Sequence, residues 1–206
     1  MPISHKHKAI FVHIPKTAGT SIERAMDIKE LDKEAYRHRD EFMIDGVKYA
    51  LQHYTAEMLM QEEAIRPHWK PYYKFAFVRH PYSRVLSEYF WVKGKKNQKL
   101  EFDRQDFKDH LKSYYVNLNT DHKLSQTQYL YSPTGVLLVD KVFKFEQIKA
   151  SFRVLSDRLK LKSKLEHAQK SSNSASYTSK LDGDDRYFIY QLYRKDFENF
   201  NYKNNL

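Results

Sequence analysis

AIFVHIPKTAGTSIER, residues 9–24, is the stretch of this 206-residue chain that indicates its fold most directly. Residues Ala9 to Ile14 are mostly apolar, β-branched or aromatic, and Pro15 ends the run, so the pattern predicts a buried strand. Small and hydroxylic residues follow, and a helical pattern resumes from Ile22 to Met26. A strand, a small-residue loop and a helix in this order place main-chain N–H groups at a helix N-terminus, where they favour a bound phosphate. The sequence therefore predicts an anion site around Lys16.

The loop is not a Walker A motif. That motif requires Gly-x4-Gly-Lys-Ser/Thr, whereas Lys16 stands three positions before Gly19, the only glycine of the loop. An ordinary turn between a strand and a helix, with an exposed lysine, is the structural alternative. On this loop alone both interpretations stay open.

A second stretch, KFAFVRHPYSRVLSEYF (residues 74–90), repeats the architecture. It has an apolar strand, a polar turn from Arg79 to Pro81, and a helix that carries hydroxyl groups at Ser83 and Ser87. Open α/β sheets bind ligands at the carboxyl ends of their strands, where both polar turns are expected to lie. The two stretches together indicate one ligand with two separate phosphates.

The two motifs resemble those of a known enzyme family. PKTAGTS resembles the 5′-phosphosulfate loop, and FVRHPYSRVLSEY resembles the 3′-phosphate motif, of sulfotransferases that use 3′-phosphoadenosine 5′-phosphosulfate (PAPS). The similarity is closest to the carbohydrate sulfotransferases of sulfotransferase family 2. Weaker similarity continues through LSQTQYLYSPTGVLLVDKVFKFEQI, LEHAQKSSNSASY and LYRKDFENFNY. The resemblance implies an α/β, P-loop-like three-layer fold with a central, mainly parallel sheet flanked by helices, in a single sulfotransferase domain over residues 1–206.

The resemblance also implies a reaction and a set of site residues. A sulfuryl group would pass from PAPS to a hydroxyl of a carbohydrate, by in-line displacement, and leave PAP as the product. By analogy with phosphoryl transfer, this reaction needs positioning, neutralisation of the leaving phosphate and a base. Lys16 is the candidate that neutralises the bridging oxygen. The expected cofactor-binding residues are Pro15, Lys16, Thr17, Ala18, Gly19, Thr20 and Ser21 for the 5′-phosphate, and Arg79 and Ser87 for the 3′-phosphate.

His53 is the candidate general base. It follows an expected strand, Val47 to Gln52, and precedes Thr55, a predicted helix N-cap, so it should face the same sheet edge as Lys16. QHYTAEML resembles the family's segment after the second strand, where a histidine is a proposed base, and an imidazole can accept a proton at neutral pH. A histidine bonded to the backbone at the helix start is the structural alternative. The substitutes for the base are His38, Glu23 and Asp40. His13 is expected to be structural, and His80 to shape its turn.

Composition limits the remaining functions. The content of 41% hydrophobic and 30% charged residues is typical of a globular protein, and no apolar run is long enough to cross a membrane. There is no cysteine, and the ten histidines are scattered along the sequence, so we expect neither disulfides nor a metal. The start of the chain has no signal-peptide pattern. Golgi-luminal members of the family that this chain resembles are usually membrane-tethered and often disulfide-bonded. The resemblance and these absences together predict a bacterial cytoplasmic enzyme, with a Golgi-luminal domain lacking its anchor as the alternative.

The formal net charge of +10 favours anionic partners. Basic residues cluster at His5–Lys8, Lys93–Lys99 and Arg158–Lys170. No nucleic-acid-binding motif accompanies them, so a nucleotide and a carbohydrate acceptor, which could be acidic, are expected in place of nucleic acid. Two other classes stay open: a metal-dependent nucleotide transferase or kinase-like enzyme, which would need Mg²⁺ and a nucleoside triphosphate, and a non-catalytic polyanion-binding module.

The rest of the chain predicts further α/β structure. Residues 29–45 should form a loop with a short helix, and a loop within residues 163–181 is expected to cover the nucleotide. A third strand–helix unit is expected at Val136–Phe145 and Gln147–Leu159. Further helices are expected at Thr55–Met60, Glu101–Val116 and Asp182–Phe200.

Overall fold

The computed structural model describes residues 2–28, 41–44, 46–96, 101–117, 119–163, 165 and 176–205. The chain divides into two compact units. The first comprises Met1–Val78 and Thr120–Ala168, and the second comprises Arg79–Asn119 and Gln169–Leu206. The single domain expected from the sequence stays a prediction.

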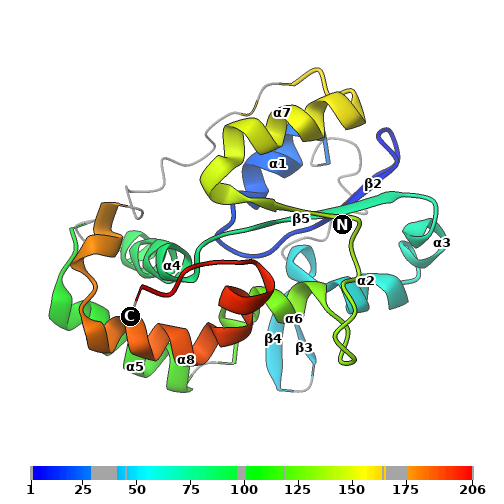
Figure 1. Ribbon diagram of the computed structural model, residues 1–206. Helices are drawn as coiled ribbons and strands as arrows, with labels where there is room; N and C mark the ends of the chain where they lie inside the picture. Colours follow the sequence, from blue (N-terminus) through cyan, green and yellow to red (C-terminus); the bar gives the residue numbers. More distant parts are fainter. Residues whose placement is uncertain are drawn as a thin grey trace. The chain divides into compact units, whose positions relative to one another are not determined.

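A four-stranded sheet lies at the centre of the first unit (Figure 1). Its strands are, in spatial order, β1 (Ile3–Ser4), β2 (Ala9–Val12), β5 (Tyr73–Val78) and β6 (Lys141–Lys144). The last three run parallel, and β1 is antiparallel to β2. All four residues of β2 are buried, because helices cover both faces of a sheet of this kind. The predicted α/β fold with a mainly parallel sheet is confirmed.

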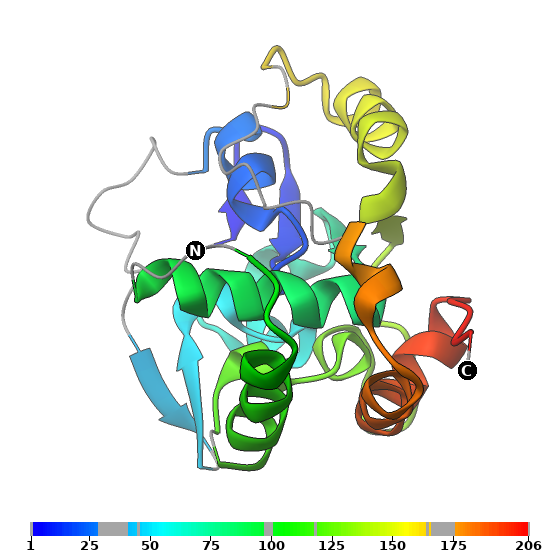
Figure 2. The same cartoon turned by 90° about the vertical axis from the view of Figure 1, so that its left-hand side faces the viewer.

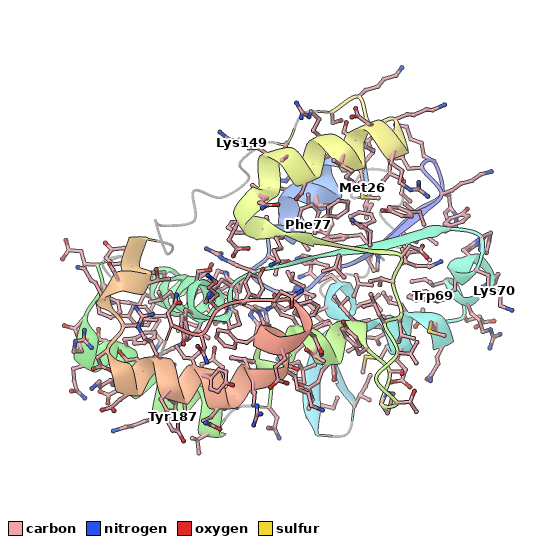
Figure 3. All side chains as sticks on the ribbon, viewed as in Figure 1. Met26, Trp69, Lys70, Phe77, Lys149 and Tyr187 are labelled. Atoms are coloured by element: carbon pink, nitrogen blue, oxygen red, sulfur yellow. The ribbon has the colours of Figure 1, made fainter. Side chains whose placement is uncertain are left out.

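Helices α1 (Gly19–Ala25) and α7 (Ile148–Leu159) cover one face of this sheet (Figure 1). Aromatic side chains of the sheet pack against these helices, and Phe77 of β5 stacks on Phe143 of β6 at a centroid distance of 5.2 Å. Figure 3 shows Met26 and Phe77 in this layer, while Lys149 on α7 points away from it. The short 3₁₀ helix η3 (Phe145–Gln147) leads from β6 into α7, so the predicted third strand–helix unit is present.

Short helices lie on the side of the sheet away from α1 and α7 (Figure 1). They are α2 (Ala56–Gln61), α3 (Arg66–Trp69) and α6 (Gln126–Leu130), together with the 3₁₀ helices η1 (Leu51–His53) and η2 (Asp121–Lys123). The hydroxyl of Thr55 accepts a hydrogen bond from the N–H of Met58 at 3.3 Å, which confirms the predicted N-cap of α2. A capping box between Ser125 and Gln128 starts α6.

The expected strand after residue 47 does not belong to the central sheet. Strands β3 (Glu41–Ile44) and β4 (Val47–Ala50) form an antiparallel hairpin of their own (Figure 2). The loop predicted for residues 29–45 is therefore wrong at 41–44, while residues 29–40 and 45 lie outside the described part of the chain. The positional argument that placed His53 at the edge of the same sheet as Lys16 is also wrong.

The expected strand Val136–Phe145 is shorter than predicted, since only Lys141–Lys144 pairs in the sheet. A tight turn occupies the preceding residues, in which the N–H of Gly135 donates to the carbonyl of Ser132 at 2.9 Å. Gly135 has a φ of 82°, a left-handed conformation that glycine adopts without strain. An isolated bridge between Tyr131 and Leu137 closes this turn.

The second unit is helical. It contains α4 (Pro81–Lys95), α5 (Arg104–Asn117), the 3₁₀ helix η4 (Ser176–Lys180) and α8 (Gly183–Asn199). Its core includes Leu86, Phe107 and Ile189. Tyr187 of α8 is 58% exposed and points away from the unit in Figure 3, so this tyrosine is not part of the core. Among the helices of the described residues, none combines the length and apolarity that a membrane span requires.

Candidate active site

The loop between β2 and α1 has an unusual backbone. Lys16 and Ala18 have φ angles of 70° and 73°, while Thr17 between them is not left-handed. Left-handed backbone costs a residue with a Cβ roughly 1–2 kcal/mol, and such strain tends to be kept at functional sites. Left-handed residues in such a loop can turn main-chain N–H groups toward one concave side, an arrangement that suits an anion. The phosphate site that the sequence predicts at this loop stays a prediction.

The side chains of the loop differ in burial and in the hydrogen bonds that they already make. Thr17 is buried, and its hydroxyl donates to the carbonyl of Ile14 at 2.8 Å, so this hydroxyl fixes the loop. Lys16, Thr20 and Ser21 are each partly exposed. Pro15 is buried, and Ala18 at the N-cap of α1 offers no capping side chain. Thr17 therefore stays in the predicted site through its main-chain N–H, and the hydroxyls of Thr20 and Ser21 remain candidates for phosphate contacts.

His13 explains the glycine of the loop. A Cβ built on Gly19 would lie 1.9 Å from both Cδ2 and Nε2 of the His13 ring, so only glycine fits against this ring. Nδ1 of His13 lies 2.8 Å from Oε1 of Glu23 on α1, and both side chains are buried. His13 is thus a packing residue of the loop, as expected. Glu23 is engaged and fully buried, which makes it a poor substitute base, and His38 and Asp40 lie outside the described residues.

His53 lies beside His13 despite the changed topology. It is the last residue of η1 and is only 6% exposed. Its ring meets that of His13 edge to face at a centroid distance of 4.8 Å, and that of His122 at 5.1 Å. Nδ1 of His53 lies 2.9 Å from Oδ2 of Asp121 on η2. Histidines that are scattered along the sequence therefore gather in space, and sequence reasoning missed both Asp121 and His122.

Arg79 and Ser87 belong to the second unit, whereas Lys16 and His53 belong to the first. Arg79 is 3% exposed, and its Nε donates to the hydroxyl of Ser83 at 3.1 Å. Ser83 and Ser87 are spaced by four on α4, so they lie on one side of the helix, and the hydrogen bond from Arg79 brings its side chain to Ser83 on that side. Ser87 is also buried. Joint action of these residues with the loop on one nucleotide stays a prediction.

His80 is held by the end of the chain. Its Nε2 lies 3.0 Å from the carbonyl of Lys203, and its ring packs against those of Phe197 and Tyr202. These contacts agree with the expected role of His80 in shaping the turn that precedes α4.

Comparison with known proteins decides the family. A family model described as "Sulfotransferase family" matches residues 1–203. The chain belongs to the sulfotransferase family. Neither the comparison with curated proteins nor that with solved structures found a match. The reaction class of this enzyme is therefore sulfuryl transfer, and its mainly parallel α/β sheet agrees with that class.

The environment of His53 in this sulfotransferase favours a neutral ring. Burial, with the neighbouring His13 and His122, lowers the pKa of His53 from 6.5 to about 4, against the opposing effect of Asp121. Burial alone would raise the pKa of Asp121. The hydrogen bond and charge of His53, together with His122 and the N–H of Ala50, hold that pKa below its usual value. At neutral pH, Asp121 is ionised and His53 is free to accept a proton.

The cluster of His53, Asp121 and His122 contains side chains of the kind that bind metal ions. Ligand-type atoms of His53, Asp121 and His122 lie within 4.8 Å of one another, a spacing that could admit a divalent cation. The hydrogen bond from His53 and that from the N–H of Ala50, at 2.9 Å, already engage Oδ2 of Asp121. His122 lies further away, with its Nε2 3.9 Å from Oδ1 of Asp121.

Proposed function

We propose that this sulfotransferase transfers the sulfuryl group of PAPS to a hydroxyl of a carbohydrate acceptor and releases PAP. The observation that carries the proposal is the backbone of the loop at residues 15–21, in which Lys16 and Ala18 are left-handed at the start of α1. Together with the family match, the loop points to a donor with a 5′-phosphosulfate.

Each part of the donor has a candidate partner. The N–H groups of residues 17–20 and the hydroxyls of Thr20 and Ser21 would hold the 5′-phosphate, since the N–H of Ser21 donates to the carbonyl of Ala18 at 3.0 Å. The ammonium group of Lys16 would neutralise the bridging oxygen. Arg79 offers a planar fork of donors for the 3′-phosphate, and Ser87 lies one helical turn beyond Ser83, the residue that Arg79 contacts.

The chemical step is a displacement at sulfur. The acceptor oxygen forms a bond to sulfur while the bond between sulfur and the bridging oxygen breaks, and the electron pair of that bond stays on PAP. Lys16 stabilises the charge that develops there. His53 takes the proton of the acceptor hydroxyl. Its lowered pKa of about 4 leaves the ring unprotonated at neutral pH. This scheme assigns no step to a metal.

A carbohydrate acceptor is the choice that the sequence supports. The motifs are closest to those of carbohydrate sulfotransferases, and the net charge of +10 favours an acceptor that carries negative charge. Phenols and peptides are the other acceptor classes to be compared in an assay.

Arg79→Ala should weaken binding of PAP by about tenfold or more, because a charge-assisted hydrogen bond is worth roughly 1.5–3 kcal/mol. Binding of 5′-AMP, which has no 3′-phosphate, should hardly change. Calorimetry with both nucleotides measures the difference. Arg194→Ala is the matched control, because Arg194 lies in the same unit, is exposed, and pairs with Glu198.

Because Arg79 is buried, the melting temperature of its alanine variant must be recorded as well. Arg79→Lys keeps the charge and removes the fork, so it should bind PAP with an intermediate affinity. Equal losses for PAP and 5′-AMP in a folded variant would mean that Arg79 does not bind the 3′-phosphate.

A further inference from the structure

We propose that Asp121 is the positioning residue for the base, and that it acts with His53 as a hydrogen-bonded pair. The inference rests on the proposed function, because it concerns the residue that accepts the acceptor's proton. The carboxylate of Asp121 meets Nδ1 of His53 at 2.9 Å, and both side chains are buried. The two residues are 68 positions apart and come from η1 and η2.

The contact fixes which nitrogen of His53 carries the proton. An ionised carboxylate can only accept hydrogen bonds, so Nδ1 of His53 must donate. In a neutral ring with a proton on Nδ1, the other nitrogen, Nε2, has a lone pair. Nε2 is therefore the atom that takes the proton from the acceptor hydroxyl.

Asp121 is itself held firmly. Its Oδ2 accepts the N–H of Ala50 at 2.9 Å, and its carbonyl accepts the hydroxyl of the buried Tyr129, also at 2.9 Å. A parallel bridge between Lys48 and Thr120 joins the same two segments of chain. The carboxylate thus has one position relative to β4 and α6, as a group that orients a catalytic side chain requires.

The ring of His53 is also held from the side of the donor loop. His13 meets it edge to face, and His13 is itself fixed by Glu23 and by close packing on Gly19. The ring of His122 contacts His53 as well. Asp121 sets the orientation of the imidazole of His53. His13 packs between this imidazole and the loop that is proposed to hold the sulfuryl donor, so it fixes the position of His53 relative to that loop.

The negative charge of Asp121 stabilises His53 most strongly after the ring has accepted a proton. His53 then becomes an imidazolium in a buried site, where an unpaired charge is costly. A carboxylate at 2.9 Å stabilises this cation and the transition state that leads to it. An asparagine at position 121 could still accept the same hydrogen bonds but would supply no charge.

Asp121→Asn should therefore lower kcat by about 10- to 100-fold, by analogy with the carboxylates that orient histidines in metal sites. The KM for PAPS and the affinity for PAP should stay within about twofold, since Asp121 contacts neither phosphate in the scheme. Asp140→Asn is the matched control. Oδ2 of Asp140 also accepts a hydrogen bond from the N–H of a strand residue, that of Lys74 near the start of β5, at 2.7 Å.

Nitrogen-15 NMR of histidine-labelled enzyme gives a readout that does not depend on turnover. In the unaltered enzyme at pH 7, His53 should carry its proton on Nδ1 and none on Nε2. A His53→Asn sample assigns the signal. A proton on Nε2 in the unaltered enzyme would overturn the inference.

A second result would also overturn it. If Asp121→Asn lowers only the melting temperature and keeps the kcat of the folded enzyme, Asp121 merely ties η2 to β4. If the unaltered enzyme transfers nothing from PAPS, the proposed function fails. The NMR spectrum then still decides whether His53 and Asp121 pair as described.

Discussion

His53→Asn is expected to lower turnover by about 10² to 10⁴, the contribution of a positioned general base. Asparagine is the sharpest substitution here, because its side-chain N–H can donate to Asp121 in place of Nδ1, while nothing replaces Nε2. His53→Ala should lose as much turnover but also some stability, since it leaves the buried carboxylate of Asp121 without this donor, a cost of about 1–3 kcal/mol. Turnover with saturating PAPS and acceptor measures the effect.

His7→Asn is the control for this substitution. His7 is another partly buried histidine of the first unit that is held through Nδ1, at 2.9 Å from the carbonyl of Leu159. It lies on the turn before β2, whereas His13 lies after that strand. The control should keep normal turnover, and both variants should bind PAP normally. A His53→Asn enzyme that is folded and turns over at nearly the normal rate would show that the base lies elsewhere.

Lys16→Ala is expected to lower the rate of transfer by about 10² to 10³ while it weakens PAP binding far less. A donor that faces developing charge acts mainly in the transition state, and the main-chain N–H groups of the loop survive the change. Single-turnover rates with labelled PAPS, compared with PAP affinity from calorimetry, separate the two effects.

Lys8→Ala matches this change closely. Lys8 is also a lysine with a left-handed backbone, φ 47°, and it directly precedes β2, whereas Lys16 follows that strand. Any effect of replacing a left-handed lysine with alanine should appear in both variants. If Lys16→Ala transfers as fast as Lys8→Ala, Lys16 does not stabilise the leaving group.

The local pattern of the sequence was enough for the two strand–loop–helix units. Each of these features depends on a pattern within about twenty residues: the strand that ends in proline, the small-residue loop and the periodicity of α4. The N-cap at Thr55 is equally local. The same holds for α8, whose start is marked by the capping box of Asp182 and Asp185.

Local patterns could not predict contacts between residues that are far apart in the sequence. The strand at residues 47–50 reads as a strand in either sheet, so periodicity could not show that it pairs with 41–44. The sequence does not show why residue 19 is a glycine, whereas in the structure the His13 ring occupies the space that a Cβ at Gly19 would need. Asp121 reaches His53 across 68 positions, and no spacing rule connects them.

Transfer from ³⁵S-labelled PAPS to a panel of glycans, phenols and peptides tests the central claim most directly. The assay is run with and without a chelator, and in parallel with Mg²⁺ and labelled ATP. We expect labelled glycan and an equal amount of PAP, at a rate that the chelator does not change, and no transfer from ATP. Loss of transfer with the chelator, or phosphoryl transfer from ATP with none from PAPS, would contradict the account.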